Sequence, residues 1–144
     1  MDKIKRLFTA TATATGGRNG HAESSDGVVR ADLSVPKEMG GPGDPGKTTP
    51  EHLFAAAYAA CFGGALDFVA RKRKQDATRA KVTAAVDVGS RDGGGFGLAV
   101  KLEVEDRSLP QAELAALAKE ALENCPYSLA TRNNVDVQLS VSGS

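Results

Sequence analysis

An apolar run of 18 residues in the middle of the chain, Leu53–Ala70, constrains the fold more than any other feature. One aspartate is its only charged residue. Pro50 suits the first turn of a helix, where its missing N–H is not needed, and Glu51 is favourable near the positive end of the helix dipole. A helix that is apolar on nearly all sides is typically buried. The sequence therefore predicts a central core helix from Pro50 to about Lys74, with Cys61 near its middle.

A membrane span is the alternative interpretation of this run, because about 18 apolar residues is the lower limit for crossing a bilayer. Most of the run is Ala and Gly, which are weakly hydrophobic, and the basic cluster Arg71–Lys74 follows at once. These features favour a core helix. The four cations lie at the negative end of the helix dipole, so we interpret them as a solvated helix end and not as a nucleic-acid patch.

Length and charge set the broad class of the protein. The 144 residues suit one domain, which we assign to residues 1–144. Lys plus Arg and Asp plus Glu both number 18, so the formal net charge is zero and gives no electrostatic case for nucleic acid or an anionic membrane. The basic start, Met1–Phe8, has no apolar stretch after it of the kind a secretory signal needs. We predict a cytoplasmic protein without nucleic-acid or membrane partners.

The rest of the chain shows strand and helix patterns in turn. We expect strands at 6–15, 27–35, 81–88, 96–105 and 135–141. A second helix is expected with Ser108 as its cap, Pro110 in its first turn, Cys125 on its apolar stripe and Pro126 at its end. Hairpins outnumber strand–helix–strand units, which indicates an α+β fold with mainly antiparallel sheet.

One segment matches a phosphate-binding motif. Gly41–Thr48 satisfies the pattern G-x-x-x-x-G-K-[ST], and a helix is predicted after it. Such a loop works by aiming backbone N–H groups at phosphates, and Pro42 and Pro45 have none to offer. No buried strand precedes the loop. We interpret it as a flexible connector, with nucleotide binding as the alternative.

The two cysteines are the remaining source of chemistry. His21 and His52 are isolated in the sequence, so no cluster has metal-ligand spacing. Two inert, buried thiols are the simplest interpretation. A reactive thiolate needs a pKa lowered by a cation or by a helix N-terminus. Cys61 lies about ten residues into its helix, beyond the reach of the first-turn dipole, and Arg18 in its glycine-flanked turn is the most suggestive cation.

Three segments carry a family resemblance. They are Thr11–Arg18, then Pro50–Ala56 leading to Ala60-Cys61-Phe62, then Cys125–Ser128 with Ala130–Arg132. In this order they resemble the organic hydroperoxide resistance proteins, the Ohr branch of the Ohr/OsmC family, over nearly the whole chain. The resemblance implies an α+β OsmC-like fold, in which antiparallel sheets surround two core helices in an intertwined homodimer.

The resemblance also implies a function and a set of site residues. It implies a thiol peroxidase that uses no cofactor, with Cys61 as the peroxidatic and Cys125 as the resolving cysteine. Arg18 corresponds to the arginine that activates the thiolate, and Glu51 to the acid that orients it. The implied substrates are organic hydroperoxides, and the implied reductant is a lipoylated or other dithiol. A less selective OsmC-type peroxidase and a non-catalytic, ligand-binding dimer are the alternatives.

The spacing of Glu51 and Cys61 bears on how such a site is assembled. Ten residues of straight helix separate them by roughly 15 Å. Either the chain bends so that Arg18 and Glu51 serve their own Cys61, or they serve the Cys61 of a second chain across a two-fold axis. The apolar central helix needs more cover than one chain of this size easily supplies. We therefore predict an obligate dimer with shared sites.

Overall fold

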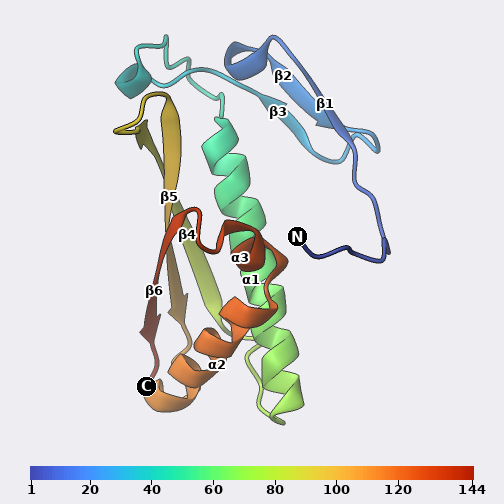
Figure 1. Cartoon of the computed structure of the whole chain (residues 1–144), viewed down its shortest axis with the longest axis vertical. Coiled ribbons are helices and arrows are strands. Elements are labelled where there is room, and N and C mark those ends of the chain that lie inside the picture. The colour runs from blue at the N-terminus through green and yellow to red at the C-terminus, as the bar shows by residue number, and fades with distance from the viewer. The chain divides into compact units, whose positions relative to one another are not determined.

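The computed structural model describes all 144 residues, which separate into two compact units, an N-terminal unit (Met1–Pro50) and a C-terminal unit (Glu51–Ser144) (Figure 1). The elements in chain order are β1 (Ala12–Thr15), η1 (Gly17–Asn19), β2 (His21–Ser24), β3 (Arg30–Asp32), η2 (Lys37–Met39), α1 (Pro50–Lys72), β4 (Lys81–Ser90), β5 (Phe96–Glu105), α2 (Gln111–Asn124), α3 (Pro126–Thr131) and β6 (Asp136–Ser142). The α+β class is confirmed. The assignment of residues 1–144 to one domain stays a prediction.

The N-terminal unit is built on an antiparallel sheet in the order β1–β2–β3. The register pairs Thr15 with His21, and His21 with Asp32 on its other side. Among the apolar side chains of this unit only Ala31 and Leu33 are buried. The unit is therefore held together mainly by backbone ladders and polar contacts.

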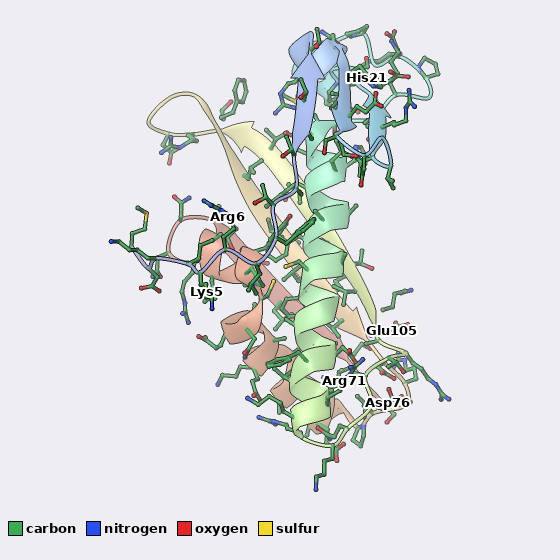
Figure 2. All side chains as sticks on the ribbon, turned by 90° about the vertical axis from the view of Figure 1, so that its right-hand side faces the viewer. Lys5, Arg6, His21, Arg71, Asp76 and Glu105 are labelled. Atoms are coloured by element: carbon green, nitrogen blue, oxygen red, sulfur yellow. The ribbon has the colours of Figure 1, made fainter.

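Both strands predicted for the N-terminal unit are shorter than expected. The first forms only over β1, and residues 1–11 have no regular secondary structure in the single chain. Lys5 and Arg6 project from this segment (Figure 2), and the apolar side chains of Ile4, Leu7 and Phe8 are exposed. The predicted strand at 27–35 shrinks to β3, because residues 25–29 form a turn before it.

The segment with the phosphate-binding pattern, Gly41–Thr48, folds as a connector. The N–H groups of Gly43, Asp44 and Thr48 donate to Val35 O, Ser34 Oγ and Asp32 O, each over 2.9 Å. These donors are used within the unit, and the two prolines have no N–H. The geometry favours the connector interpretation over nucleotide binding.

The C-terminal unit contains a second sheet in the order β4–β5–β6. Strands β4 and β5 form a long antiparallel hairpin, from Lys81↔Glu105 to Ser90↔Phe96, around the predicted Gly-rich turn. Strands β5 and β6 are parallel, whereas the pairs β1–β2, β2–β3 and β4–β5 are antiparallel, so the expectation of mainly antiparallel sheet is confirmed. The reason for the parallel pair is the crossover: α2 and α3 carry the chain back along the sheet, and a parallel pair needs such a long connection.

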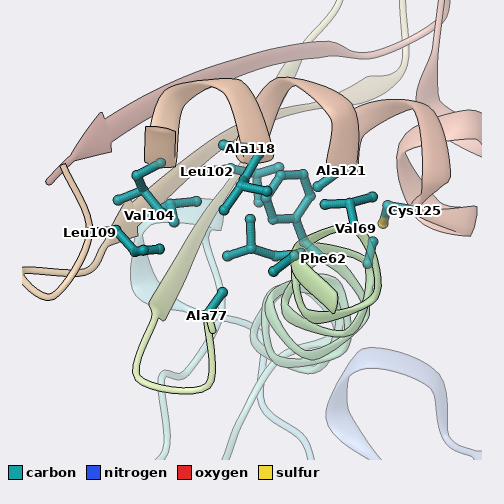
Figure 3. Close-up of a cluster of buried hydrophobic side chains, with 14 of the residues drawn as sticks. Phe62, Val69, Ala77, Leu102, Val104, Leu109, Ala118, Ala121 and Cys125 are labelled. Atoms are coloured by element: carbon teal, nitrogen blue, oxygen red, sulfur yellow. The ribbon is translucent and has the colours of Figure 1, made fainter. Parts of the chain in front are cut away.

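One hydrophobic core lies between the helices and this sheet. Figure 3 shows side chains from α1, α2 and the strands meeting there. The largest fully buried side chains are Tyr58, Phe62, Leu66, Val69, Val100, Leu102, Val104, Leu114, Leu117 and Cys125. All of them belong to the C-terminal unit, so this unit carries its own core.

The central helix prediction is confirmed by α1, although its two faces differ. One face is buried in the core, whereas five residues at four-residue spacing are exposed: His52, Ala56, Ala60, Gly64 and Phe68. By length and composition alone, α1 is long and apolar enough to cross a membrane. Its packing against α2 and the sheet identifies it as a core helix with one side uncovered in the single chain.

The cations at the end of α1 have specific partners. Arg71 pairs with Asp67 at 2.8 Å (Arg71 is labelled in Figure 2), and Arg73 pairs with Glu120 of α2 at 2.6 Å. The helix closes through Lys74, which adopts the left-handed conformation (φ 56°). These contacts support the interpretation of the basic cluster as a helix end.

The start and end of α2 correct two predictions. Ser108 does not cap the helix; its N–H and hydroxyl both donate to Asp106 Oδ1, and Pro110 occupies the cap position. Cys125 lies just beyond α2 and not on its last turn. Pro126 disfavours helical geometry in the residue before it, so Cys125 is extended (φ −78°, ψ 120°) and joins α2 to α3.

Candidate active site

Cys61 lies at the edge of the buried face of α1. Its neighbours on that face, Tyr58 and Phe62, are fully buried, whereas Cys61 itself is half-buried. The apolar sequence of α1 thus fixes the thiol beside the core and leaves one side open.

Cys125 brings the second thiol to the first. Its Sγ lies 3.6 Å from Cys61 Sγ, within hydrogen-bond distance for sulfur, and both cysteines are free thiols. Cys125 is fully buried at the joint between α2 and α3. The two cysteines that the sequence singled out are therefore neighbours, although 64 positions separate them in the chain.

The surroundings of Cys61 act on its pKa in opposite directions. Burial raises the pKa of the Cys61 thiol, and the nearby Cys125 thiol adds to the rise. The backbone N–H of Tyr127, in the first turn of α3, donates a hydrogen bond to the Cys61 sulfur and so lowers the Cys61 pKa. The balance is a raised pKa, so further positive charge is needed to make Cys61 a thiolate at neutral pH.

Aromatic rings pack beside the thiol pair. The ring of Tyr127 stacks on Phe54 with centroids 6.1 Å apart, and meets Tyr58 edge-on at 5.8 Å. Phe54 and Tyr58 are themselves 5.7 Å apart. These three rings tie α1 to α3 on the side of Cys61 that leads toward the start of α1.

A cavity opens beside Cys61 in the other direction. It has a volume of about 380 Å³ and is lined by Cys61, Gly64, Ala65, Phe68, Asn124 and Pro126. Apart from the thiol and Asn124, its wall is apolar. The space suits a small apolar group next to the sulfur.

Arg18 lies in the N-terminal unit, in the five-residue turn between β1 and β2, where it is half-buried. Gly16 and Gly17 adopt positive φ values of 79° and 58° there. A Cβ on Gly20 would fall 1.8 Å from Thr15 O, so no larger residue fits. Asn19 braces the turn by accepting a hydrogen bond from Val35 N–H at 2.9 Å. The glycines thus shape a turn that presents Arg18.

Glu51 lies in the first turn of α1, in the C-terminal unit, ten residues before Cys61. The structure places Glu51 and Cys61 on one helix and Arg18 in the other unit. The pairing of Arg18 with Glu51, and of Arg18 with the Cys61 thiolate, stays a prediction.

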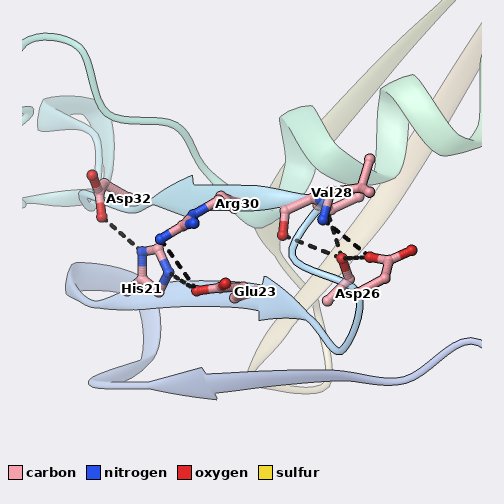
Figure 4. Close-up of polar contacts among 8 residues, drawn as sticks. His21, Glu23, Asp26, Val28, Arg30 and Asp32 are labelled. Carbon is pink, nitrogen blue, oxygen red and sulfur yellow. Dashed lines mark hydrogen bonds and ion pairs between the residues drawn. The ribbon is translucent and has the colours of Figure 1, made fainter.

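The N-terminal sheet also holds a histidine between two acids. His21 Nδ1 lies 2.8 Å from Asp32 and Nε2 lies 3.1 Å from Glu23, with Arg30 3.8 Å from Glu23 (Figure 4). The hydrogen bond to Asp32, followed by that to Glu23, raises the pKa of His21. The histidine that is isolated in the sequence therefore links β2 to β3.

Sequence reasoning found both thiols but missed the N–H of Tyr127. A backbone donor has no residue-type signature, and its position depends on the unpredicted helix α3. The only signal in the sequence is Pro126, which suits the first position of a new helix as well as the end of an old one.

Comparison with known proteins assigns the class of this fold and site. The family described as OsmC-like protein matches residues 41–140. An organic hydroperoxide resistance protein of Xanthomonas axonopodis pv. citri is 48% identical over 139 residues, which cover 96% of each chain. The chain therefore belongs to the OsmC-like family.

Solved structures give the branch within that family. A crystal structure of an organic hydroperoxide resistance protein from Legionella pneumophila matches with a TM-score of 0.89 and 48% identity, over 96% of this chain and 99% of that one. Another, from Elizabethkingia anophelis with thiocyanate bound, matches with a TM-score of 0.91 and 44% identity, over 98% and 100%. The resemblance to the organic hydroperoxide resistance proteins is confirmed.

Proposed function

We propose that this protein is a thiol peroxidase that reduces organic hydroperoxides to alcohols. The observation that carries the proposal is the 3.6 Å separation of the Cys61 and Cys125 sulfurs, one half-buried beside a cavity and the other fully buried behind it. Relatives that are 48% identical bear the name organic hydroperoxide resistance protein, which supports the same role here.

The chemistry follows from the ordinary reactions of thiols. The Cys61 thiolate attacks one peroxide oxygen, the O–O bond breaks, and the alkoxide takes a proton and leaves as an alcohol. Cys61 becomes a sulfenic acid. The sulfur of Cys125, after losing its proton, attacks the Cys61 sulfur, water leaves, and a disulfide forms. Two thiols of a lipoylated or other dithiol reductant then reduce that disulfide by exchange.

We assign to Arg18, from the N-terminal unit, the positive charge that Cys61 needs, and to Glu51, from the first turn of α1, the orientation of that charge. Because burial raises the pKa of Cys61, a guanidinium near the sulfur stabilises the thiolate and then the negative charge that develops on the peroxide oxygen. A carboxylate can hold a guanidinium by a two-pronged pair, and we assign that role to Glu51.

The cavity beside Cys61 favours hydroperoxides that carry an apolar group. The apolar wall, which includes Ala65 and Phe68, removes an alkyl or aryl tail from water, and this burial favours binding of the hydroperoxide. Hydrogen peroxide has no such tail. We therefore expect faster turnover of cumene hydroperoxide than of hydrogen peroxide, and equal rates would favour a less selective OsmC-type peroxidase.

A homodimer is part of the proposal, because a second copy covers the apolar surface that one chain leaves open. Phe68 on the uncovered face of α1 is 54% exposed, and Phe96 and Leu98 on β5 are 70% and 40% exposed. Exposed apolar surface of this kind marks an interaction site. A reducing, cytoplasmic compartment fits a disulfide that must be reduced in each cycle.

A peroxidase assay with single-cysteine variants tests the function. The wild-type protein should turn over cumene hydroperoxide with dihydrolipoamide, and Cys61→Ser should abolish the activity. Cys125→Ser should consume about one equivalent of hydroperoxide and then stop, because the sulfenic acid has no partner thiol. Equal residual activity in both variants would remove the assignment of the two roles.

A mixing experiment tests whether sites are shared between chains. Cys61→Ser protein and Arg18→Ala protein, unfolded and refolded together, should recover activity in about half of the sites of each heterodimer if Arg18 serves the other chain. Heterodimers without recovered activity would support a site built within one chain.

A further inference from the structure

A buried group of three hydroxyl side chains links α1 to α3 and is not used by the chemistry proposed above. Tyr58, Ser128 and Thr131 are 0%, 7% and 8% exposed. The Tyr58 hydroxyl oxygen lies 3.0 Å from Ser128 Oγ and 3.1 Å from Thr131 Oγ1. Burying a hydroxyl group costs free energy unless it is hydrogen-bonded. The hydrogen bonds among these three side chains therefore fix how they are arranged.

The direction of each hydrogen bond follows from the number of protons available. Thr131 Oγ1 donates its one proton to backbone carbonyls, that of Tyr127 at 3.0 Å and that of Ser128 at 3.2 Å. Thr131 must therefore accept the proton of Tyr58, and Tyr58 in turn must accept that of Ser128. The result is a chain of donors that runs from Ser128 through Tyr58 and Thr131 to the carbonyl of Tyr127.

The end of this chain is the residue whose N–H bonds to the reactive sulfur. Tyr127 receives a hydrogen bond at its carbonyl from Thr131 and donates its N–H to Cys61. Tyr58 and Cys61 are three residues apart on α1 and lie on the same side of that helix. Helix α1 thus holds α3 at two neighbouring points, the hydroxyl of Tyr58 and the sulfur of Cys61.

We propose that Tyr58 is a positioning residue for the reaction assigned to Cys61, an inference that rests on the proposed function. Its hydroxyl holds α3 so that the Tyr127 N–H meets the Cys61 sulfur and the Cys125 sulfur stands 3.6 Å away. The short helix α3 has only six residues, so one lost anchor releases a large share of its support.

The test is Tyr58→Phe in the full-length protein, because phenylalanine keeps the ring and removes only the hydroxyl. Two quantities are measured: the pH dependence of Cys61 alkylation by iodoacetamide, located by mass spectrometry, and the rate of disulfide formation after one equivalent of cumene hydroperoxide. We expect a higher Cys61 pKa and a disulfide rate lower by about threefold to tenfold, the usual range for one lost hydrogen bond. Thr131→Val should act in the same direction, and the double variant should be little worse than either single variant.

Val69→Ala is the matched control, since it destabilises the buried face of α1 two turns beyond Cys61. It should leave the Cys61 pKa and the disulfide rate unchanged. The inference is overturned if Tyr58→Phe behaves as wild type in both measurements, or if Val69→Ala reproduces its effects. Full peroxidase activity in Cys61→Ser would instead overturn the proposed function, and the alkylation measurement would still report on Tyr58.

Discussion

The two units hold their functional residues by different means. In the C-terminal unit, Cys61 and Cys125 border a continuous apolar core, and every member of that core lies in this unit. In the N-terminal unit, Arg18 stands on a glycine-shaped turn of a sheet that buries only two apolar side chains, Ala31 and Leu33. Packing fixes the thiols, whereas backbone ladders and side-chain hydrogen bonds fix the arginine. The thiol pair is thus the rigid part of the proposed site, and Arg18 the part that can move at lower cost.

The largest effect is expected from the core itself, through a matched pair of Leu→Ala substitutions. Leu102 in the C-terminal unit and Leu33 in the N-terminal unit are both buried. Buried Leu→Ala changes cost about 2–5 kcal/mol, and the loss grows with the cavity that remains. The loss of unfolding free energy should be near the upper end of this range for Leu102→Ala, because a continuous core cannot easily close the cavity. For Leu33→Ala it should be near the lower end. Urea denaturation measures both; equal losses would show that the N-terminal unit is packed as firmly as the other.

A smaller and chemically specific effect is expected from Arg18→Ala. Loss of the cation should raise the Cys61 pKa and slow oxidation at neutral pH by about tenfold to hundredfold, since a nearby opposite charge shifts a pKa by one to three units. Peroxidase rates and Cys61 alkylation measure the effect.

The pH dependence of Cys61 alkylation in the same variant shows in which direction the Cys61 pKa shifts. Because burial raises the pKa of Cys61, the alkylation rate of Arg18→Ala should climb only at a pH above the ordinary thiol pKa, as the thiolate forms. Arg18→Lys is the control and should restore part of the shift. An Arg18→Ala profile that matches wild type would mean that another group activates the thiol.

The smallest effect is expected from His21→Gln in the N-terminal sheet. The pKa of His21 is raised by Asp32 and Glu23, so its contribution to stability is complete below the unfolded pKa of about 6.5 and is lost as the pH rises through the folded value. The variant should melt slightly lower than wild type at pH 5.5 and together with it at pH 8.5. A difference that grows toward alkaline pH would contradict this assignment.

The predictable part of the fold is the part that local signals specify. The length and low polarity of the apolar run predicted α1. Strand-like patterns on either side of a Gly-rich turn predicted β4 and β5. The strand expected at 6–15 formed only over β1, because a strand needs a partner that the local sequence does not name. The direction of β6 depended on where α2 and α3 return the chain, which periodicity does not report.

The candidate site divides in the same way. Cys61 and Cys125 were found as residue types within motifs, and the structure brings them together. The Tyr127 N–H and the role of Tyr58 were missed, because one is a backbone group and the other looked like any apolar residue of a core helix. Both depend on α3, which was not predicted because Pro126 was interpreted only as the end of the preceding helix.

The joint at Cys125 has a consequence for how the protein is recognised by other molecules. The two sulfurs stand 3.6 Å apart in the reduced form, and a disulfide holds them at about 2.05 Å. The remaining gap of about 1.5 Å is within reach of side-chain rotation at an extended residue between two helices. The proposed disulfide can therefore form through a local change at the joint between α2 and α3. A molecule that reduces the proposed disulfide then has to approach through the Cys61 sulfur, because Cys61 is half-buried whereas Cys125 is fully buried.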